Sequence, residues 1–149
     1  MKSCFSPVIR KPSVMLIGCL VWLAGCASAP PDRSLYERLG GMPMIKAIVD
    51  KKVDGAASDP RSKRSFEGVN LARTKEGIVI FICAATGGPC KYQGASMSKV
   101  HEGMGITSVE FDVVGGHLSD TLDELHVGAR EKKELLDLLG SMKRDIVTK

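Results

Sequence analysis

The sequence predicts an all-α domain, and three observations support this fold class. After residue 34, apolar side chains recur every three to four residues, the spacing that places them on one face of a helix. Two Ser/Thr-x-x-Glu patterns mark helix starts, and clusters of glycine and proline end the helical segments. Only one short apolar run would suit a strand, and no second run is available to pair with it.

The first part of the domain is expected to form two helices. Ser34-Leu-Tyr-Glu37 is a capping box, and Gly40-Gly41 ends the short helix that it begins. Pro43 suits the first turn of a second helix, which Asp59-Pro60 ends before a short turn toward Phe66. The buried face of this second helix is expected to carry Met44, Ile45, Ile48 and Val49.

A third long helix is expected from Leu71 to Thr86, ended by Gly87-Gly88-Pro89. The run from Ile78 to Ile82 is rich in β-branched residues, which favour strands. It lies inside a longer segment with a charged beginning, so a helix is predicted there. A short helix is expected from Ser96 to Gly103.

Two more helices are expected in the C-terminal part. Thr107-Ser-Val-Glu110 is the second capping box. The helix that it begins has apolar residues at helical spacing, namely Phe111, Val114, Leu118, Leu122 and Leu125. The last helix is expected from about Ala129 to Val147. Its buried face should carry Leu135, Leu136, Leu138 and Leu139.

The composition indicates one domain and excludes a nucleic-acid-binding role. A chain of 149 residues suits one compact domain. Lys2, Arg10 and Lys11 lie before residue 26, where the chain has no acidic residue, so removing these three charges from the formal +4 leaves +1. No basic field remains to hold phosphates, and no nucleic-acid partner is expected.

Residues 1–25 resemble a bacterial lipoprotein signal peptide. Basic residues precede an apolar run from Val14 to Leu23, shorter than the roughly 20 residues that span a bilayer, and Leu23-Ala24-Gly25-Cys26 is similar to the lipoprotein cleavage box. The resemblance implies lipidation of Cys26, a tether over 26–33 and a membrane anchor for a domain at 34–149. Ala27 in place of aspartate implies the periplasmic face of the outer membrane in a Gram-negative cell. The alternative is a secreted protein with a chance cysteine at this place.

The histidines are the first candidates for chemistry. The chain has three of them, His101, His117 and His126. No CxxCH motif is present, which excludes covalent c-type haem attachment, and no zinc-binding spacing occurs. His101 follows Met97 and Val100 and precedes Gly103-Met-Gly-Ile106. An imidazole presented from a short helix into an apolar layer is what an axial haem ligand requires. His117 is expected to be structural and His126 to be solvated.

The string from Gly87 to Ile106, GGPCKYQGASMSKVHEGMGI, resembles the hallmark of group 1 truncated haemoglobins. The resemblance extends to Ser34–Gly41 and Gly116–Leu118 and covers residues 34–147. It implies a two-over-two helical sandwich around non-covalently bound haem b, with His101 as the proximal iron ligand. The resemblance also implies that the haem is surrounded by Phe66, Thr74, Lys75, Ile78, Tyr92, Met97, Val100, Ile106, Phe111 and Val114.

The distal side departs from the family. The position of the usual ligand-binding tyrosine holds Val53, and that of an assisting glutamine holds Ile78. Thr74 is the only polar candidate there, and a threonine often bonds its own helix backbone instead. A hydrogen bond to a strongly polar group contributes about 1.5–3 kcal/mol. We therefore expect the pocket to hold oxygen more weakly than its relatives do, with carbon monoxide and nitric oxide less affected.

Two lysines and two cysteines leave alternatives open. Lys52 stands where the family has a buried phenylalanine, and it either extends outward along the haem edge, reaches a propionate, or ligates the iron as a neutral amine. By the same resemblance, Gly77 stands where the family often has a basic residue near a haem propionate. Lys75 would then have to contact that propionate instead. Cys83 and Cys90 are either free thiols or one disulfide, which requires the Gly87-Gly88-Pro89 break to fold the chain back.

Three functions fit these residues. The leading one is a non-enzymatic haem protein at the cell envelope that binds oxygen, nitric oxide or carbon monoxide, or passes electrons to a redox partner protein. The second is a nitric oxide dioxygenase, which needs a long-lived oxygen complex that the apolar distal side disfavours. The third is a lipoprotein that kept the globin scaffold and lost haem; Lys52 favours this, whereas His101 and Phe66 argue against it.

Overall fold

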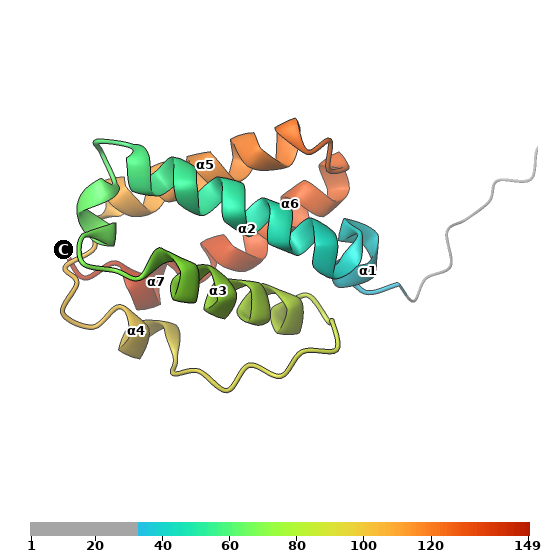
Figure 1. Ribbon diagram of the computed structural model, residues 1–149, viewed down its shortest axis with the longest axis horizontal. Coiled ribbons are helices and arrows are strands. Elements are labelled where there is room, and N and C mark those ends of the chain that lie inside the picture. Colours follow the sequence, from blue (N-terminus) through green and yellow to red (C-terminus); the bar gives the residue numbers. More distant parts are fainter. Residues whose placement is uncertain (1–32) are drawn as a thin grey trace, which may run out of the picture.

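The computed structural model describes residues 33–149, so the predicted leader and Cys26 lie outside the described residues. This part is all helical and contains no strand, as the sequence predicts (Figure 1). None of its helices combines the length and the apolar character needed to cross a membrane. The elements in chain order are α1 (Leu35–Leu39), α2 (Gly41–Ser58), the 3-10 helix η1 (Lys63–Phe66), α3 (Leu71–Ala85), α4 (Met97–Val100), α5 (Ser108–Glu124), α6 (Ala129–Gly140) and α7 (Lys143–Ile146).

Helix α2 is the centre of the arrangement. It packs against α3 on one side and α5 on the other, α5 packs against α6, and α1 contacts both α2 and α6 (Figure 1). Most of the fully or almost fully buried apolar side chains come from the long helices. They include Ile45, Ile48, Val49 and Val53 of α2, Ile82 and Cys83 of α3, Leu118 and Leu122 of α5, and Leu135 of α6.

Both predicted capping boxes are present. The Ser34 hydroxyl accepts a hydrogen bond from the Glu37 amide at 3.2 Å, and the Glu37 carboxylate accepts one from the Ser34 amide at 3.0 Å. Thr107 and Glu110 make the same exchange at the start of α5. Gly40 ends α1 with a φ of +100°, a conformation that favours glycine.

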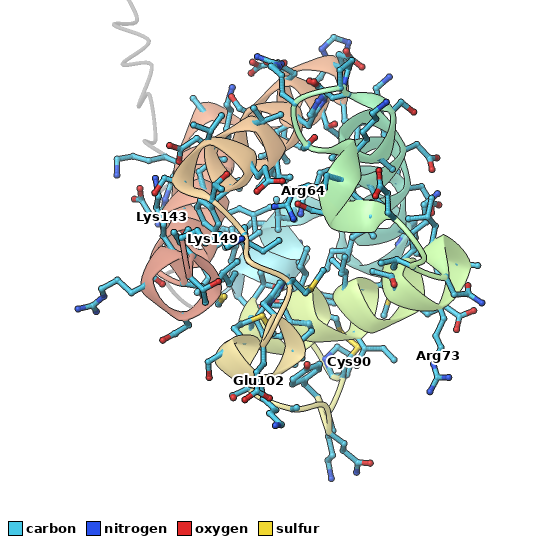
Figure 2. The ribbon with its side chains drawn as sticks, turned by 90° about the vertical axis from the view of Figure 1, so that its left-hand side faces the viewer. Arg64, Arg73, Cys90, Glu102, Lys143 and Lys149 are labelled. Atoms are coloured by element: carbon cyan, nitrogen blue, oxygen red, sulfur yellow. A yellow bond between two sulfur atoms is a disulfide. The ribbon has the colours of Figure 1, made fainter. Side chains whose placement is uncertain are left out.

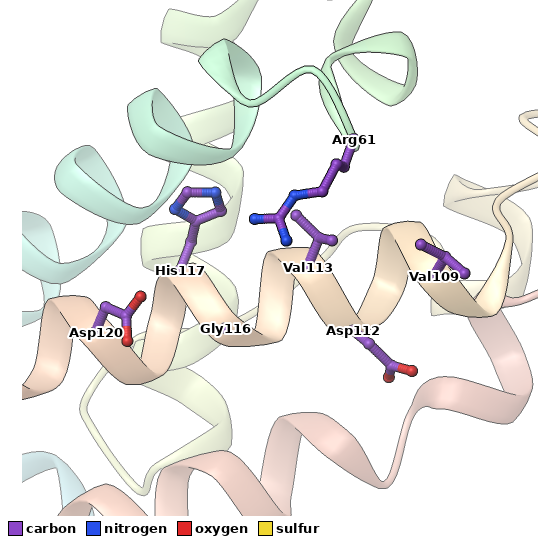
Figure 3. A pocket seen from close by; sticks show the side chains of 7 residues that line it. All are labelled: Arg61, Val109, Asp112, Val113, Gly116, His117 and Asp120. Carbon is purple, nitrogen blue, oxygen red and sulfur yellow. The ribbon is translucent and has the colours of Figure 1, made fainter.

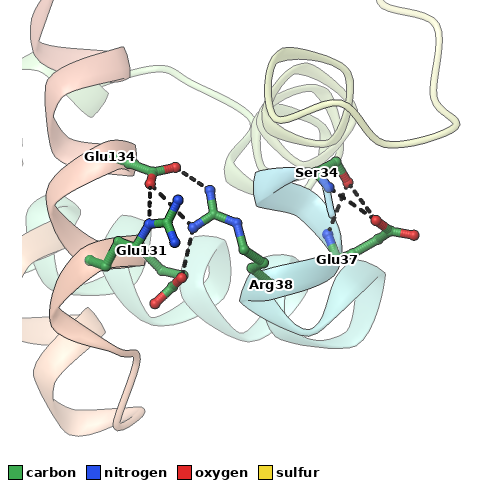
Figure 4. A network of polar contacts seen from close by, with 6 residues as sticks. Ser34, Glu37, Arg38, Glu131 and Glu134 are labelled. Atoms are coloured by element: carbon green, nitrogen blue, oxygen red, sulfur yellow. Dashed lines mark hydrogen bonds and ion pairs between the residues drawn. The ribbon is translucent and has the colours of Figure 1, made fainter. Parts of the chain in front are cut away.

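An ion-pair network joins the first helix to α6 (Figure 4). The guanidinium of Arg38 donates to Glu131 at 2.7 Å and also pairs with Glu134. Arg130 donates to the same Glu134 from one turn earlier on α6, at 3.0 Å. The hydrogen bond from Arg38 lowers the pKa of Glu134 below its usual value. The network therefore fixes the short α1 against an element about 100 residues later in the chain.

Two helix boundaries differ from the sequence prediction. The last helix is not continuous from Ala129 to Val147, because it breaks after Gly140 into α6 and α7. Glycine weakens a helix, and the Ser141 hydroxyl bonds the Leu138 carbonyl at 2.7 Å in competition with the helical backbone. The helix predicted from Ser96 to Gly103 is also shorter than expected. Only Met97–Val100 (α4) is helical, and Ser96 is its N-cap residue.

The structure resolves the alternatives for the two cysteines in favour of a disulfide between Cys83 and Cys90. Gly87 adopts a φ of +82°, and the amide of Gly88 donates to the Cys83 carbonyl at 2.7 Å, so the chain folds back at the end of α3. The two Cα atoms are consequently 5.7 Å apart, within the range that a disulfide bridges.

Candidate functional site

His101 follows the last residue of α4 and is partly buried. Ser96 fixes this short helix by accepting a hydrogen bond from the Lys99 amide at 3.3 Å. Nδ1 of His101 lies 2.8 Å from the carbonyl oxygen of Met97, to which it donates when it carries the proton. That hydrogen bond orients the ring and leaves Nε2 with its lone pair, which is the state of a metal-ligating histidine.

The residues predicted on the distal side, Val53, Thr74 and Ile78, lie on α2 and α3, and Phe66, predicted to pack against the porphyrin, lies on η1. Phe66 ends η1 and is partly buried, Val53 is fully buried, and Ile78 is partly buried. All three pack in the same apolar cluster. Thr74 is also partly buried, and within residues 33–149 its hydroxyl makes no hydrogen bond to its own helix or to another side chain.

The remaining predicted haem neighbours surround His101 in the sequence and differ in exposure. Ile106 is buried, whereas the Val100 side chain is 47% exposed. Met97, Phe111 and Val114 are partly buried. These residues come from α4, the loop after it and the first turns of α5.

Tyr92 has a structural partner that the sequence analysis missed. Its ring meets that of Phe81 edge to face with the centroids 5.1 Å apart, and its hydroxyl donates to the Ala95 carbonyl at 2.9 Å. Phe81 follows Ile78 by three residues on α3, so helical spacing could have identified it as a neighbour on the same face. The pair attaches the loop before α4 to α3.

Lys52 lies on the buried face of α2. It follows Ile48 by four residues and precedes Ala56 by four, and both of these residues are buried. In residues 33–149, no carboxylate lies within ion-pair distance of its amine, and burial lowers the pKa of Lys52 to about 8. Of the three alternatives for this lysine, the structure selects none.

Lys75 has carboxylate partners on α2. Its amine lies 2.8 Å from Asp54 and 3.5 Å from Asp50, and these partners raise its pKa. This double pairing joins α3 to α2 and competes with the propionate contact that the resemblance implies for Lys75. The other predicted replacement, Gly77, has open space around it.

His117 lies on α5 and His126 follows that helix, whereas His101 follows α4. Nε2 of His117 lies 3.0 Å from the Asp59 carboxylate, which also accepts two hydrogen bonds from the Arg61 guanidinium at 2.7 and 3.0 Å. These donors, Arg61 above all, hold the pKa of Asp59 far below its usual range. The His117 imidazole packs on Gly55, where a side chain would collide with it. His126 is exposed, as expected.

The His117 side chain borders a surface hollow over α5 (Figure 3). The hollow is lined by one guanidinium, one imidazole, two carboxylates and three apolar residues. His101 does not line it. The residues around it are Arg61, Val109, Asp112, Val113, Gly116, His117 and Asp120. Such mixed charge selects no single class of ligand, so we assign the hollow no role.

The groups around His101 fit haem, the cofactor that the sequence resemblance implies. The donor is a single imidazole whose Nδ1 is already engaged by the Met97 carbonyl and whose Nε2 is available. Between residues 33 and 149, no three side chains of the His, Cys, Asp and Glu types gather into an ordinary metal site. A single imidazole with one free nitrogen would suit an iron whose remaining protein-independent ligands come from a porphyrin.

Comparison with known proteins gives consistent matches over this part of the chain. Residues 34–148 match the family model described as bacterial-like globin. A group 1 truncated haemoglobin, GlbN, of Mycolicibacterium paratuberculosis is 36% identical over 115 residues, which cover 77% of this chain and 85% of the relative.

Solved structures show the same arrangement of helices. The truncated haemoglobin of Tetrahymena pyriformis in its Fe(III) form superimposes with a TM-score of 0.74 at 28% identity. The 2/2 haemoglobin of Synechococcus sp. PCC 7002, solved in the cyanomet state with covalently attached haem, gives a TM-score of 0.73 at 31% identity. Each match covers 78% of this chain and the whole of the solved chain. The two-over-two sandwich expected from the sequence is therefore the observed fold.

Proposed function

This chain belongs to the bacterial-like globin family, as a group 1 truncated globin, and we propose that it binds haem b through His101 and reversibly binds a diatomic gas. The iron of haem supplies the site at which such a gas binds. His101 holds that iron through Nε2, while Phe66 packs against the porphyrin. Val53, Thr74 and Ile78 border the gas-binding side. Electron transfer to a redox partner is the second use open to the same site.

The observation that carries this proposal is the hydrogen bond between Nδ1 of His101 and the Met97 carbonyl, at 2.8 Å. A histidine that ligates a metal needs its second nitrogen held, because this bond sets the tautomer and the ring plane.

Hemin titration tests the proposal. Residues 33–149 are suitable for expression because they correspond to the complete length of the solved relatives. The wild-type domain should bind one hemin and give a Soret band, and His101→Ala should lose most of its affinity. The matched control is His126→Ala, which removes an exposed histidine and should leave the band unchanged. If the wild-type domain binds no hemin, the proposal is wrong and the chain is a globin scaffold without haem.

Because the proposed gas-binding side is mostly apolar, adding a polar group there should slow the release of oxygen. Ile78→Gln adds an amide at a partly buried position without a large change of volume. A new hydrogen bond of about 1.5 kcal/mol should slow oxygen release roughly tenfold. Stopped-flow measurement of the oxygen and carbon monoxide dissociation rates checks this, since carbon monoxide release should change much less. Equal slowing of both gases would indicate a steric effect and contradict the argument.

We also propose that the domain is held at the cell envelope by a lipid on Cys26. The support is the order of basic, apolar and small residues before Cys26 and the start of the globin match at residue 34, which leaves a short segment between them. Metabolic labelling with a fatty acid in a bacterial host tests this. Label should be incorporated into the wild-type chain and absent from Cys26→Ser, and label that persists in the variant would refute lipidation at this residue.

A further inference from the structure

Arg64 and Glu110 join η1 to the start of α5. Nε of Arg64 donates to one carboxylate oxygen of Glu110 at 2.8 Å, and Nη2 donates to the other at 2.6 Å. The Glu110 side chain is only 8% exposed, and it also accepts hydrogen bonds from Ser65 and from the amide and hydroxyl of Thr107. These bonds, that of Arg64 above all, lower the pKa of Glu110 to about 2. The carboxylate is therefore a fixed anionic anchor for the arginine.

The same guanidinium reaches the loop between α4 and α5. It donates to the backbone carbonyls of Met104 at 3.3 Å and Gly105 at 3.0 Å. The next carbonyl, that of Ile106, accepts hydrogen bonds from the backbone amides of Thr148 at 3.0 Å and Lys149 at 3.3 Å. Three consecutive carbonyls of this loop are thus held from outside it. In Figure 2, Arg64 and Lys149 lie close together at the face where the chain ends.

This loop begins at His101. The amide of Met104 donates to the His101 carbonyl at 3.2 Å, and Gly103 and Gly105 take φ values of +77° and +58°. Glycine is permissive at such positions, so the loop has little conformational preference of its own. At its other end, Arg64 stands two residues before Phe66 within the same turn of η1. One side chain therefore connects the turn that carries Phe66 to the loop that carries the imidazole.

We propose that Arg64 is a positioning residue that sets the place of His101 relative to Phe66, with Glu110 as its anchor. The inference rests on the proposed haem site, because those two side chains are the ones assigned to the iron and to the porphyrin face. An arginine suits this task because its planar group offers several donors in fixed directions. A lysine has all its donors on one nitrogen, so it lacks the separate nitrogens with which Arg64 contacts both Glu110 oxygens and the two carbonyls.

The experiment compares two arginines that each tie distant elements together. Arg64→Met breaks the connection described above, and Arg38→Met breaks the α1–α6 network, which contains no predicted haem neighbour. For each domain of residues 33–149, one measures the urea midpoint without haem and the rate at which hemin passes to an excess of apomyoglobin. Arg64→Met should lose hemin about tenfold faster than wild type, the effect of one charge-assisted hydrogen bond. Arg38→Met should stay within about twofold of wild type despite a similar loss of stability.

Equal hemin loss from the two variants at equal stability would overturn the inference and reduce Arg64 to a purely structural tie. If Arg64→Met does not fold, Arg64→Lys takes its place, since it keeps a charge near Glu110 and loses the carbonyl bonds. Arg64→Lys should still lose hemin several-fold faster than wild type, and wild-type behaviour would overturn the inference. Failure of the wild-type domain to bind hemin at all is a different result, because it removes the proposed function itself.

Discussion

Lys52 is the residue whose surroundings disagree most with its chemistry. It occupies the buried face of α2 with apolar neighbours one turn away on either side, and burial lowers the pKa of its amine from 10.5 to about 8. The charged form is therefore disfavoured in the folded state. By the sequence resemblance, the family has a buried phenylalanine at this position, whereas here a partly buried lysine occupies it.

The lowered pKa of Lys52 predicts a pH-dependent stability. Below about pH 8 the folded and unfolded states both carry the proton, so the folded state bears the cost of a largely desolvated charge, at most roughly 3 kcal/mol. Between about pH 8 and 10.5 the unfolded chain holds a proton that the folded chain has released, so stability rises with pH. Lys52→Met should be more stable than wild type at pH 7 by up to that amount, and the difference should shrink toward pH 10.5.

Urea unfolding of the haem-free domain at several pH values measures this difference. Lys46→Met, on the exposed side of the same helix, is the control for the loss of a lysine. A Lys52→Met variant that is less stable than wild type at pH 7 would mean that the amine makes a favourable contact, contrary to the account.

Gly88, the second residue of the Gly-Gly-Pro motif, has no room for a side chain. A Cβ built there would lie 2.6 Å from Cδ2 of Tyr36 and 2.7 Å from the Cys83 carbonyl oxygen, a backbone atom that cannot move aside. Gly88→Ala should therefore destabilise the domain by about 1–3 kcal/mol. Gly77→Ala is the matched control, because open space surrounds it in the middle of α3, and it should stabilise the domain by about 0.5–1 kcal/mol. Thermal or urea unfolding separates the two, and equal effects would contradict the packing argument.

The disulfide between Cys83 and Cys90 governs how α3 meets the segment that leads to α4. Cys83 is fully buried near the end of α3, and the bond closes a short loop through the Gly87-Gly88 turn. The chain-entropy relation gives a stabilisation of about 2.5 kcal/mol for a loop of this length. Residues 33–149 contain no other cysteine, so every thiol effect in this domain belongs to this pair.

Reduction should therefore lower the stability of the domain by about 2–3 kcal/mol. Urea unfolding with and without a thiol reductant measures the change, and alkylation followed by mass spectrometry counts the free thiols. The double variant Cys83→Ala/Cys90→Ala supplies the control, since reductant should not affect it. Two alkylated thiols in the protein prepared without reductant would contradict the disulfide.

The sequence predicted most of the helices, but fewer of the residues at which they end. The caps at Ser34 and Thr107 are local patterns, and the structure confirms both. The β-branched run from Ile78 to Ile82 is helical because it lies within α3, as the surrounding segment indicated. The break after Gly140 was missed, since the leucines continue their helical spacing up to it and only Ser141 competes for the backbone.

For the whole molecule, the contacts that place the site could not be read from spacing. Arg64 and Glu110 are 46 residues apart, and Arg38 and Glu134 are 96 apart. In neither pair does the sequence around one residue identify its partner, because such long-range pairs depend on how α2, α5 and α6 pack. His101 was identifiable because its motif is local, whereas the carboxylate partners of Lys75 on α2 appeared only with the fold.

Gas binding by this domain depends, in the proposed function, on a bond between Nε2 of His101 and haem iron. Resonance Raman spectroscopy of the ferrous domain measures that bond directly through the iron–histidine stretching band. We predict a band that shifts when histidine is labelled with nitrogen-15, disappears in His101→Gly, and returns when free imidazole is added to that variant. An iron–histidine band that survives unchanged in His101→Gly would show that another residue ligates the iron and would contradict the account.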